Sequence, residues 1–383
     1  EARKASDFAR FRPWLEKLVR LKREEAKAVG RGGPLYDALL DEYEPGETAA
    51  RLRQVFAELR SALVDLVGRI GVSGRNPDLS ILQRTYPIAT QEMFGKTVAA
   101  ACGFDFQAGR LDATTHPFCS GIGPGDARLT TRYNRREFGD AFFSILHETG
   151  HGLYDQGLDP EHYGTPMGEA VSLGIHESQS RLWENFVARS RAFWEYWFPQ
   201  ARQAFPEALA GVGLDAFVFA VNDVRPSLIR VDADEATYNL HILLRFELEQ
   251  AVIAGDLSVA DLPAAWRDGM TRLLGITPPD DAQGCLQDIH WSGGSFGYFP
   301  TYTLGNLYAA QFFARAQAEL GDLDEQFRRG EVLPLKEWLN RKIHREGQRY
   351  RAADLVTAVT GEPLNPEYLL RHLRQKFGEL YGL

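Results

Sequence analysis

The stretch FFSILHETGHGLYDQ, residues 142–156, places two histidines and a glutamate within an otherwise apolar segment. His147 and His151 are four residues apart, so on a helix their rings lie on one face, one turn apart. This spacing lets both rings reach one Zn²⁺ ion at about 2.0–2.1 Å from each nitrogen. Glu148 is rotated by about 100° from His147, which keeps it off the ion but near a bound water. The H-E-x-x-H pattern therefore predicts a metallopeptidase centre with Glu148 as general base.

Two helices are expected around this centre. The first is predicted to begin at Asn134, which a glutamate follows three residues later in a capping-box arrangement, and to end at Gly157. The second is predicted over residues 165–186, TPMGEAVSLGIHESQSRLWENF, with Thr165 as N-cap and Pro166 in its first turn. The second helix follows directly and is therefore the place to look for further ligands.

A catalytic zinc ion needs a third protein ligand and one open position. No histidine follows His151 at the spacing of the longer metallopeptidase motif, so a carboxylate on the second helix is the alternative. That helix carries Glu169, His176, Glu177 and Glu184. We prefer Glu177, which lies about two turns beyond Glu169 and beside the apolar face of Ile175. For Glu169 and Glu184 the alternative is a solvated helix face, and spacing alone does not decide the choice.

Most of the remaining chain has the apolar spacing of helices. The expected helices cover residues 8–30, 48–70, 78–101, 166–188, 234–254, 299–320 and 366–380. Residues 109–134, GRLDATTHPFCSGIGPGDARLTTRYN, alternate around a Gly/Pro turn and predict a small antiparallel hairpin or sheet. The sequence therefore predicts a mainly α fold, in which residues 1–383 form a single large helical domain with a small antiparallel β-sheet beside the site.

Composition excludes several classes of partner. The net charge of -9 and the pI near 5.6 argue against nucleic acid or an anionic membrane surface. The three cysteines form no C-x-x-C pair, so neither a disulfide framework nor a cysteine zinc site is expected. The sequence has no apolar run of about 18 residues and no signal-peptide stretch at its start, so a cytoplasmic location is expected.

Six further blocks follow one another over about 190 residues. They are HPF (116–118), DARLT (126–130), HES (176–178), IRVDAD (229–234), GCLQDIHW (284–291) and GSFGYFPTYTLGN (294–306). Together with HETGH, they resemble in order the signature blocks of the carboxypeptidase Taq family of metallocarboxypeptidases. Ordered blocks over such a length are far more specific than one H-E-x-x-H match.

The resemblance implies a zinc-type metallocarboxypeptidase, also active with cobalt in some members, that removes residues singly from peptide C-termini with broad specificity. It implies a mostly helical fold with a small sheet, a deep active-site groove and a homodimer. On this sequence, His147, His151 and Glu177 would be the metal ligands and Glu148 the catalytic base. One divalent cation per chain and peptide substrates are therefore expected.

Such an enzyme must bind the terminal carboxylate of its substrate, for which the arginine fork is best suited. The candidates are Arg230 in IRVDAD and Arg128 in DARLT, and Arg230 is preferred because the resemblance places it in the substrate groove. For Arg128 the alternative is a structural ion pair with Asp126 or Asp234.

His290 and Tyr302 are expected to donate hydrogen bonds to the oxyanion of the tetrahedral intermediate, with Tyr298 one turn earlier on the same face. The alternative is that Tyr298, Phe299 and Tyr302 form an aromatic core stripe. His116 in HPF has two interpretations, a substrate-binding place in the groove wall or a satisfied core histidine.

Family members are longer and carry H-E-x-x-H well past their middle, so this chain is expected to lack the family's N-terminal segment. Two other functions therefore stay open. One is a peptide-binding protein with little or no turnover because its lid is absent. The other is an oligopeptidase, whose cleavage would not depend on a free C-terminal carboxylate.

Overall fold

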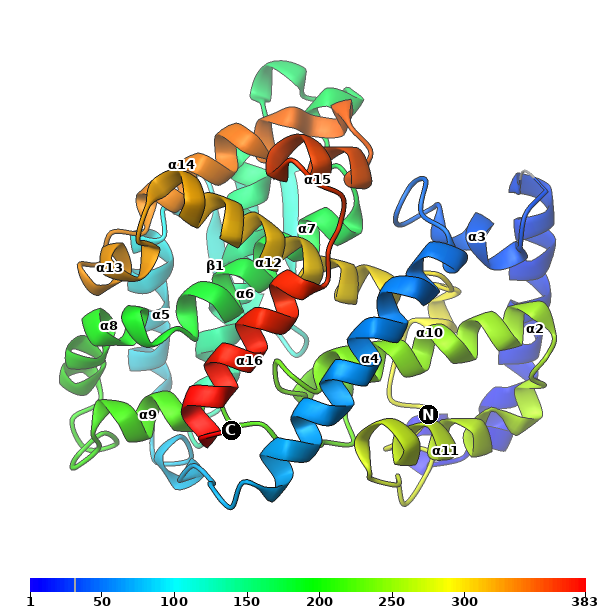
Figure 1. The fold of residues 1–383 in the computed structure, drawn as a ribbon, viewed down its shortest axis with the longest axis horizontal. Coiled ribbons are helices and arrows are strands. Elements are labelled where there is room, and N and C mark those ends of the chain that lie inside the picture. The colour runs from blue at the N-terminus through cyan, green and yellow to red at the C-terminus, as the bar shows by residue number, and fades with distance from the viewer. Residues whose placement is uncertain (31) are drawn as a thin grey trace. The chain divides into compact units, whose positions relative to one another are not determined.

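The computed structural model describes residues 1–30 and 32–383. The chain divides into two compact units, and the first consists of Glu1–Gly74, Val224–Leu304 and Leu370–Leu383. The second consists of Arg75–Asp223 and Gly305–Leu369. Helices dominate both units, which confirms the mainly α prediction (Figure 1).

The first unit is built from helices joined by short turns. Its elements are α1 (Ala2–Ala5), α2 (Phe8–Val29), α3 (Leu35–Leu40), α4 (Ala49–Val72), η5 (Arg230–Asp232), α10 (Tyr238–Ala254), η6 (Val259–Asp261), α11 (Leu262–Leu274), η7 (Trp291–Gly293) and the greater part of α16 (Glu367–Tyr381). Helix α10 contacts α2, α3, α4 and α11 and is buried along almost its whole length. Helix α4 turns Leu52, Phe56, Leu59 and Leu63 inward, at the three- and four-residue spacing of one helical face.

A buried carboxylate on α10 fixes the segment that joins η7 to the next helix. Glu249 is fully buried and accepts hydrogen bonds from Tyr36 Oη at 2.8 Å and Trp291 Nε1 at 2.8 Å. It also accepts one from the backbone N–H of Gly297 at 3.1 Å, where the chain has a φ of 91° that favours glycine. The hydrogen bonds from Trp291 and Gly297 therefore tie this segment to α10, and the one from Tyr36 ties α3 to the same carboxylate.

The second unit combines helices with one small sheet. Its helical elements are η1 (Leu79–Ile81), α5 (Ile88–Ala101), α6 (Phe138–Gly157), η2 (Pro160–His162), η3 (Pro166–Gly168), α7 (Leu173–Arg181), the π-helical η4 (Leu182–Ala188), α8 (Arg191–Ala204), α9 (Leu214–Val221), the greater part of α12 (Pro300–Leu320), α13 (Leu323–Arg328), α14 (Leu333–Lys342), η8 (His344–Arg349) and α15 (Ala352–Thr360).

The sheet consists of β1 (Arg110–Ala113), β2 (Cys119–Gly123) and β3 (Asp126–Thr131) in the order β1-β3-β2. Strands β2 and β3 form the expected antiparallel pair, with Ser120 opposite Arg128. Strand β1 runs parallel to β3, with Leu111 opposite Leu129, so the expectation of a purely antiparallel sheet is wrong. In the chain β2 follows β1, but in the sheet β3 lies between them. Strand β3 turns back antiparallel beside β2 and therefore runs parallel to β1.

Helix α6 contacts both the sheet and α7, and two glycines on its opposite faces make this possible. A Cβ on Gly152 would lie 2.8 Å from Leu129 Cδ2 on β3. A Cβ on Gly150 would lie 2.4 Å from the carbonyl oxygen of Gln179 on α7. Positions two residues apart are separated by about 200° around a helix, so each glycine admits a different neighbour. The two approaches place the H-E-x-x-H segment close to its surroundings on both sides.

Three predicted helix starts are wrong. The helix expected over residues 78–101 begins only at Ile88, after the short η1 and Pro87. Helix α6 has Glu137 as its N-cap with no side-chain cap, while Asn134 Oδ1 accepts from the backbone N–H of Arg136 in a local turn. Thr165 precedes only the short η3, and α7 starts later with Ser172 as a capping residue whose hydroxyl accepts from the N–H of Ile175. The predicted end of α6 at Gly157 is confirmed.

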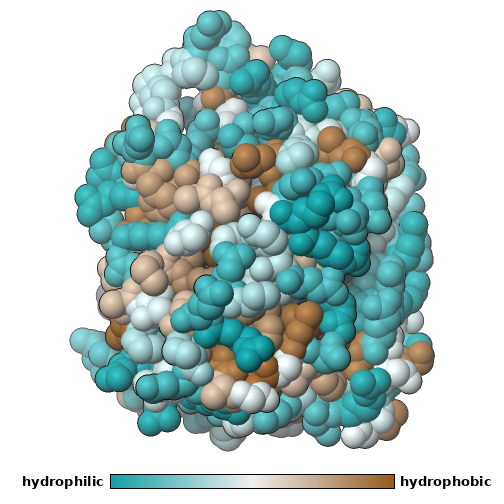
Figure 2. Space-filling view, turned by 90° about the vertical axis from the view of Figure 1, so that its left-hand side faces the viewer, coloured by the Kyte–Doolittle hydropathy of each residue, from teal (hydrophilic) through white to brown (hydrophobic). Residues whose placement is uncertain are grey.

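The surface seen in Figure 2 is mainly hydrophilic, with separate apolar patches. Within residues 1–30 and 32–383, no helix is both long and apolar enough to cross a bilayer. Cys102, Cys119 and Cys285 are free thiols.

Candidate metal site

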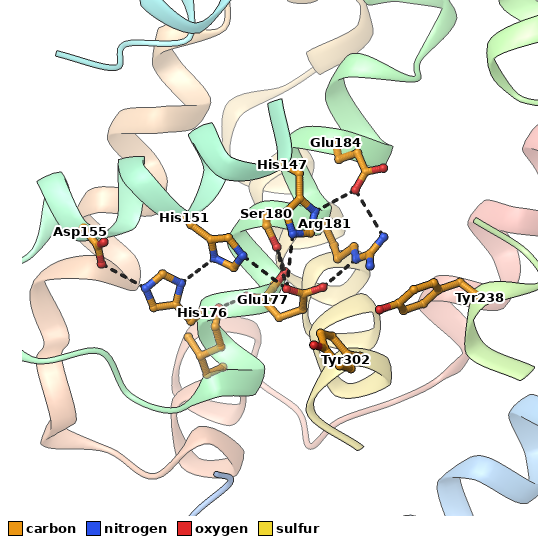
Figure 3. Close-up of polar contacts among 12 residues, drawn as sticks. His147, His151, Asp155, His176, Glu177, Ser180, Arg181, Glu184, Tyr238 and Tyr302 are labelled. Atoms are coloured by element: carbon orange, nitrogen blue, oxygen red, sulfur yellow. Dashed lines mark hydrogen bonds and ion pairs between the residues drawn. The ribbon is translucent and has the colours of Figure 1, made fainter. Parts of the chain in front are cut away.

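The second unit brings His147 and His151 of α6 together with Glu177 of α7, and potential ligand atoms of all three lie within 4.8 Å of one another (Figure 3). Glu177 Oε2 is 3.4 Å from His151 Nε2 and 3.7 Å from His147 Nε2. Atoms that share a tetrahedral ion at about 2.0–2.2 Å are themselves about 3.3–3.6 Å apart, so the spacing suits one cation.

Glu177 is held in place from its own helix and from beside it. Its carboxylate accepts hydrogen bonds from Ser180 Oγ at 3.1 Å and from Arg181 Nε at 2.8 Å, and only 8% of its side chain is exposed. A Cβ on Gly305 would lie 2.5 Å from Glu177 Cγ, so a glycine is needed where α12 passes. Packing and hydrogen bonds thus leave Glu177 Oε2 turned toward the two histidines.

The protonation states of Glu177 and His151 fit a divalent cation. Burial acts to raise the pKa of Glu177, but Arg181 and the two histidines outweigh it and hold that pKa well below its usual range. Burial lowers the pKa of His151 to about 4, so its ring is neutral near pH 7. Two imidazole nitrogens and one carboxylate oxygen form a donor set typical of catalytic zinc. The three side chains present therefore suit such an ion.

Glu148 follows His147 on α6 and is 6% exposed. Burial raises its pKa to about 7, with His147 lowering that pKa and Glu177 raising it. A carboxyl group with a pKa near the working pH can both accept and return a proton. The surroundings of Glu148 therefore suit general acid–base chemistry.

Each histidine contacts an outer partner through its second nitrogen. His147 Nδ1 lies 2.9 Å from Glu184 Oε2, and His151 Nδ1 lies 2.6 Å from His176 Nδ1 (Figure 3). The solvated-face alternative is wrong for Glu184, whose side chain is 13% exposed, whereas Glu169 is exposed. A sequence signal for Glu184 exists, because it follows Glu177 by seven residues, two helical turns.

The first unit contains the arginine preferred for substrate binding, in a buried cluster. Arg230 is 6% exposed, and its Nε donates to Asp288 Oδ1 at 2.9 Å. Arg245 is fully buried and donates to the other oxygen of Asp288 at 2.7 Å. Two guanidinium groups thus share one carboxylate, which leaves one positive charge in excess. Such a cluster is suited to a further anion.

His290 and Tyr302 are also together in the first unit, with His290 Nε2 3.0 Å from Tyr302 Oη. The ring of Tyr298 packs edge-on against His290 at 5.1 Å between centroids. Phe299 is fully buried, whereas Tyr298 and Tyr302 are partly exposed, so only Phe299 fits the core-stripe alternative.

The remaining two candidates lie on or beside the sheet of the second unit. Arg128 donates from Nε and from a terminal nitrogen to the carboxylate of Asp126, two residues away on β3, which is one of the two ion pairs considered for it. Its side chain remains 47% exposed. His116 is exposed, so its interpretation as a core histidine is wrong.

Comparisons with known proteins agree on one family. A family model described as carboxypeptidase Taq (M32) metallopeptidase matches residues 1–377. Thermostable carboxypeptidase 1 of Thermus thermophilus is 53% identical over 100% of this chain and 76% of its own length, and Carboxypeptidase 1 of Bacillus subtilis is 43% identical over the same shares. The crystal structure of an M32 carboxypeptidase from Deinococcus radiodurans R1 has a TM-score of 0.98 and 46% identity, with 100% of this chain and 77% of that chain covered. This chain thus spans about three quarters of the length of these relatives.

Proposed function

This chain belongs to the carboxypeptidase Taq (M32) family and is a metallocarboxypeptidase that acts on peptides, and we propose that it holds one zinc ion with His147, His151 and Glu177. The spacing of the three donor atoms supports this assignment. Cobalt is the expected functional substitute. A cation bound there would supply Lewis acidity, polarising the substrate carbonyl and lowering the pKa of a bound water.

Glu148 is the proposed general base. Its place directly after His147 on α6, and its burial, support this role. In the reaction, the Glu148 carboxylate accepts a proton from the attacking water and then delivers it to the leaving amine of the C-terminal residue.

Arg230 is the proposed receptor for the terminal carboxylate, and the excess positive charge of its cluster supports the assignment. His290 and Tyr302 are proposed to serve the oxyanion as a hydrogen-bonded pair, in which Tyr302 Oη accepts from His290 Nε2 and donates its own hydrogen to the oxyanion. Tyr298, Arg128 and His116 are further proposed substrate contacts.

Several finer predictions accompany this scheme. Broad specificity, a deep groove, a homodimer, a cytoplasmic location and a single catalytic domain over residues 1–383 stay predictions from the sequence and its family resemblance. None of them is needed for the chemistry above.

The observation that carries the proposal is the convergence of His147, His151 and Glu177. Its test is release of free amino acids from an unblocked peptide and from its C-terminally amidated twin, with apo, zinc-loaded and cobalt-loaded protein. We expect stepwise, metal-dependent release from the unblocked peptide only.

The matched variants are Glu148→Gln, which should abolish release, and Glu161→Gln at an exposed position, which should not change it. Cleavage of the amidated peptide would indicate an oligopeptidase. Binding without release from metal-loaded protein would indicate a peptide-binding protein. Full activity of Glu148→Gln would contradict the general-base assignment.

A further inference from the structure

A chain of three side chains ends on the metal-site histidine His151. Asp155 Oδ1 lies 3.0 Å from His176 Nε2, and His176 Nδ1 lies 2.6 Å from His151 Nδ1. Figure 3 shows the ring of His176 between the other two side chains. Asp155 follows His151 by four residues, so both project from the same face of α6, and His176 reaches them from α7.

The order of the groups dictates where the hydrogens are. The Asp155 carboxylate only accepts hydrogen bonds, so the facing nitrogen of His176, Nε2, carries a hydrogen and donates it. A metal-ligating His151 keeps Nε2 without hydrogen and carries its own on Nδ1. His176 Nδ1 is then the acceptor for that hydrogen. Through His176, the carboxylate of Asp155 thus favours the tautomer of His151 whose Nε2 can bind a metal.

The position of Asp155 is itself defined by its neighbours. Its second oxygen lies 3.7 Å from Cys119 Sγ of β2, and a Cβ on Gly121 of the same strand would stand 3.1 Å from that oxygen. His176 packs against the ring of Tyr154 at 5.0 Å between centroids. Strand and helix therefore restrict the carboxylate to the side that faces His176.

The partner of His147 is of a different kind. Glu184 Oε2 faces His147 Nδ1 directly, and Arg181 and Arg189 each contact the same carboxylate at 3.3 Å. One histidine is thus supported by an anion held between two arginines, the other by an imidazole. The carboxylate of Glu184 orients the ring of His147 directly. The orientation of His151 depends instead on the ring of His176, which lies between His151 and Asp155.

We propose that His176 is a positioning residue for His151: held by Asp155, it accepts the Nδ1 hydrogen of His151 and leaves Nε2 of His151 facing the metal site. This inference rests on the proposed metal site. His176 is not proposed to contact the substrate. Asp155 is proposed to affect His151 only through His176.

The test is the dissociation constant for Zn²⁺, measured by competition with a chromophoric chelator on the full chain. We expect His176→Leu to bind Zn²⁺ about 10–100-fold more weakly, the range usual for loss of an outer partner of a metal ligand. His176→Asn places an oxygen near the position of Nδ1 and should recover most of the affinity. The visible spectrum of cobalt-loaded protein should change in His176→Leu and return toward the parent in His176→Asn.

A double-mutant cycle tests the link from Asp155. Asp155→Ala should weaken Zn²⁺ binding in the parent and have no further effect in His176→Leu, because its influence passes through the missing ring. Equal effects of Asp155→Ala in both backgrounds would overturn that link.

The matched control is His344→Leu, which removes another buried histidine of the second unit, one that faces Gln179 and Asn340. It should leave Zn²⁺ affinity unchanged. The proposal is wrong if His176→Leu binds as tightly as the parent, or if His344→Leu weakens binding equally. A parent that binds no Zn²⁺ would instead contradict the metal site, and this inference with it.

Discussion

Gly150 of α6 lies so close to Gln179 of α7 that a Cβ on Gly150 would stand 2.4 Å from the carbonyl oxygen of Gln179. The atom would also lie 2.5 Å from Ser180 Cα, so backbone rather than a movable side chain is in the way. This contact sets the distance between the helix with both histidines and the helix with Glu177. The arrangement of the metal site therefore depends on Gly150, although a glycine has no side chain that could bind the cation.

Gly150→Ala should force α6 and α7 apart. We expect the free energy of unfolding to fall by about 1–3 kcal/mol, as for other overpacked cores, and Zn²⁺ affinity to fall with it. Urea unfolding of apo-protein and chelator competition measure the two effects. Gly139→Ala is the control, because its Cβ would meet nothing nearer than Phe143 Cδ2 at 3.6 Å. Unchanged stability of Gly150→Ala would show that the two helices are not held by this approach.

Removal of the cation should lower the thermal stability of the parent. A ligand present at a hundred times its dissociation constant stabilises the folded state by about 2.7 kcal/mol, and a chelator removes that contribution. Calorimetry with and without EDTA measures it. His147→Ala and His151→Ala should melt at the same temperature with or without EDTA. An equal EDTA effect in these variants would place the cation elsewhere.

Arg230→Lys should lower kcat/KM for an unblocked peptide by about 10–100-fold, because lysine keeps the charge beside Asp288 but loses the fork that binds a carboxylate. Steady-state kinetics of amino-acid release measures the change. Arg128→Lys is the parallel variant and should have little effect, since Arg128 already pairs with Asp126 at the surface. The reverse pattern would transfer the carboxylate-binding role to Arg128.

Glu235 should make the protein sensitive to acid. Its carboxylate lies 2.8 Å from His372 Nε2 and 2.7 Å from Lys376 Nζ. Burial acts to raise the pKa of Glu235, but the two partners, Lys376 first, lower it to about 2. The unfolded-state pKa is about 4.3, so this stabilisation is present above that pH and is lost as pH falls toward 2.

Glu235→Gln should therefore lower the free energy of unfolding by about 3 kcal/mol at pH 7, and the difference from the parent should shrink between pH 4 and pH 2. Urea unfolding across this range is the measurement. Glu207→Gln, at an exposed position, should show no such pH dependence. A difference between Glu235→Gln and the parent that stays constant below pH 4 would contradict the ion-pair explanation.

The periodicity of one helix determined much of the site. Because side chains four apart share a helical face, the HETGH segment by itself placed His147 and His151 side by side and Glu148 off to one side. The same rule puts Asp155 on the face of His151. Helical spacing also predicted the main helices, since each must bury one apolar stripe wherever it packs.

Tertiary structure decided which side chains face His147 and His151. Spacing could not select Glu177 over Glu169 or Glu184, because helical rules relate residues within one element and do not say how closely two elements approach. The close passage of α7 at Gly150 brings Glu177 to the histidines, while a late helix start at Ser172 leaves Glu169 exposed. The outer partner His176 and the parallel course of β1 likewise follow from packing between segments, whose contacts no local pattern contains.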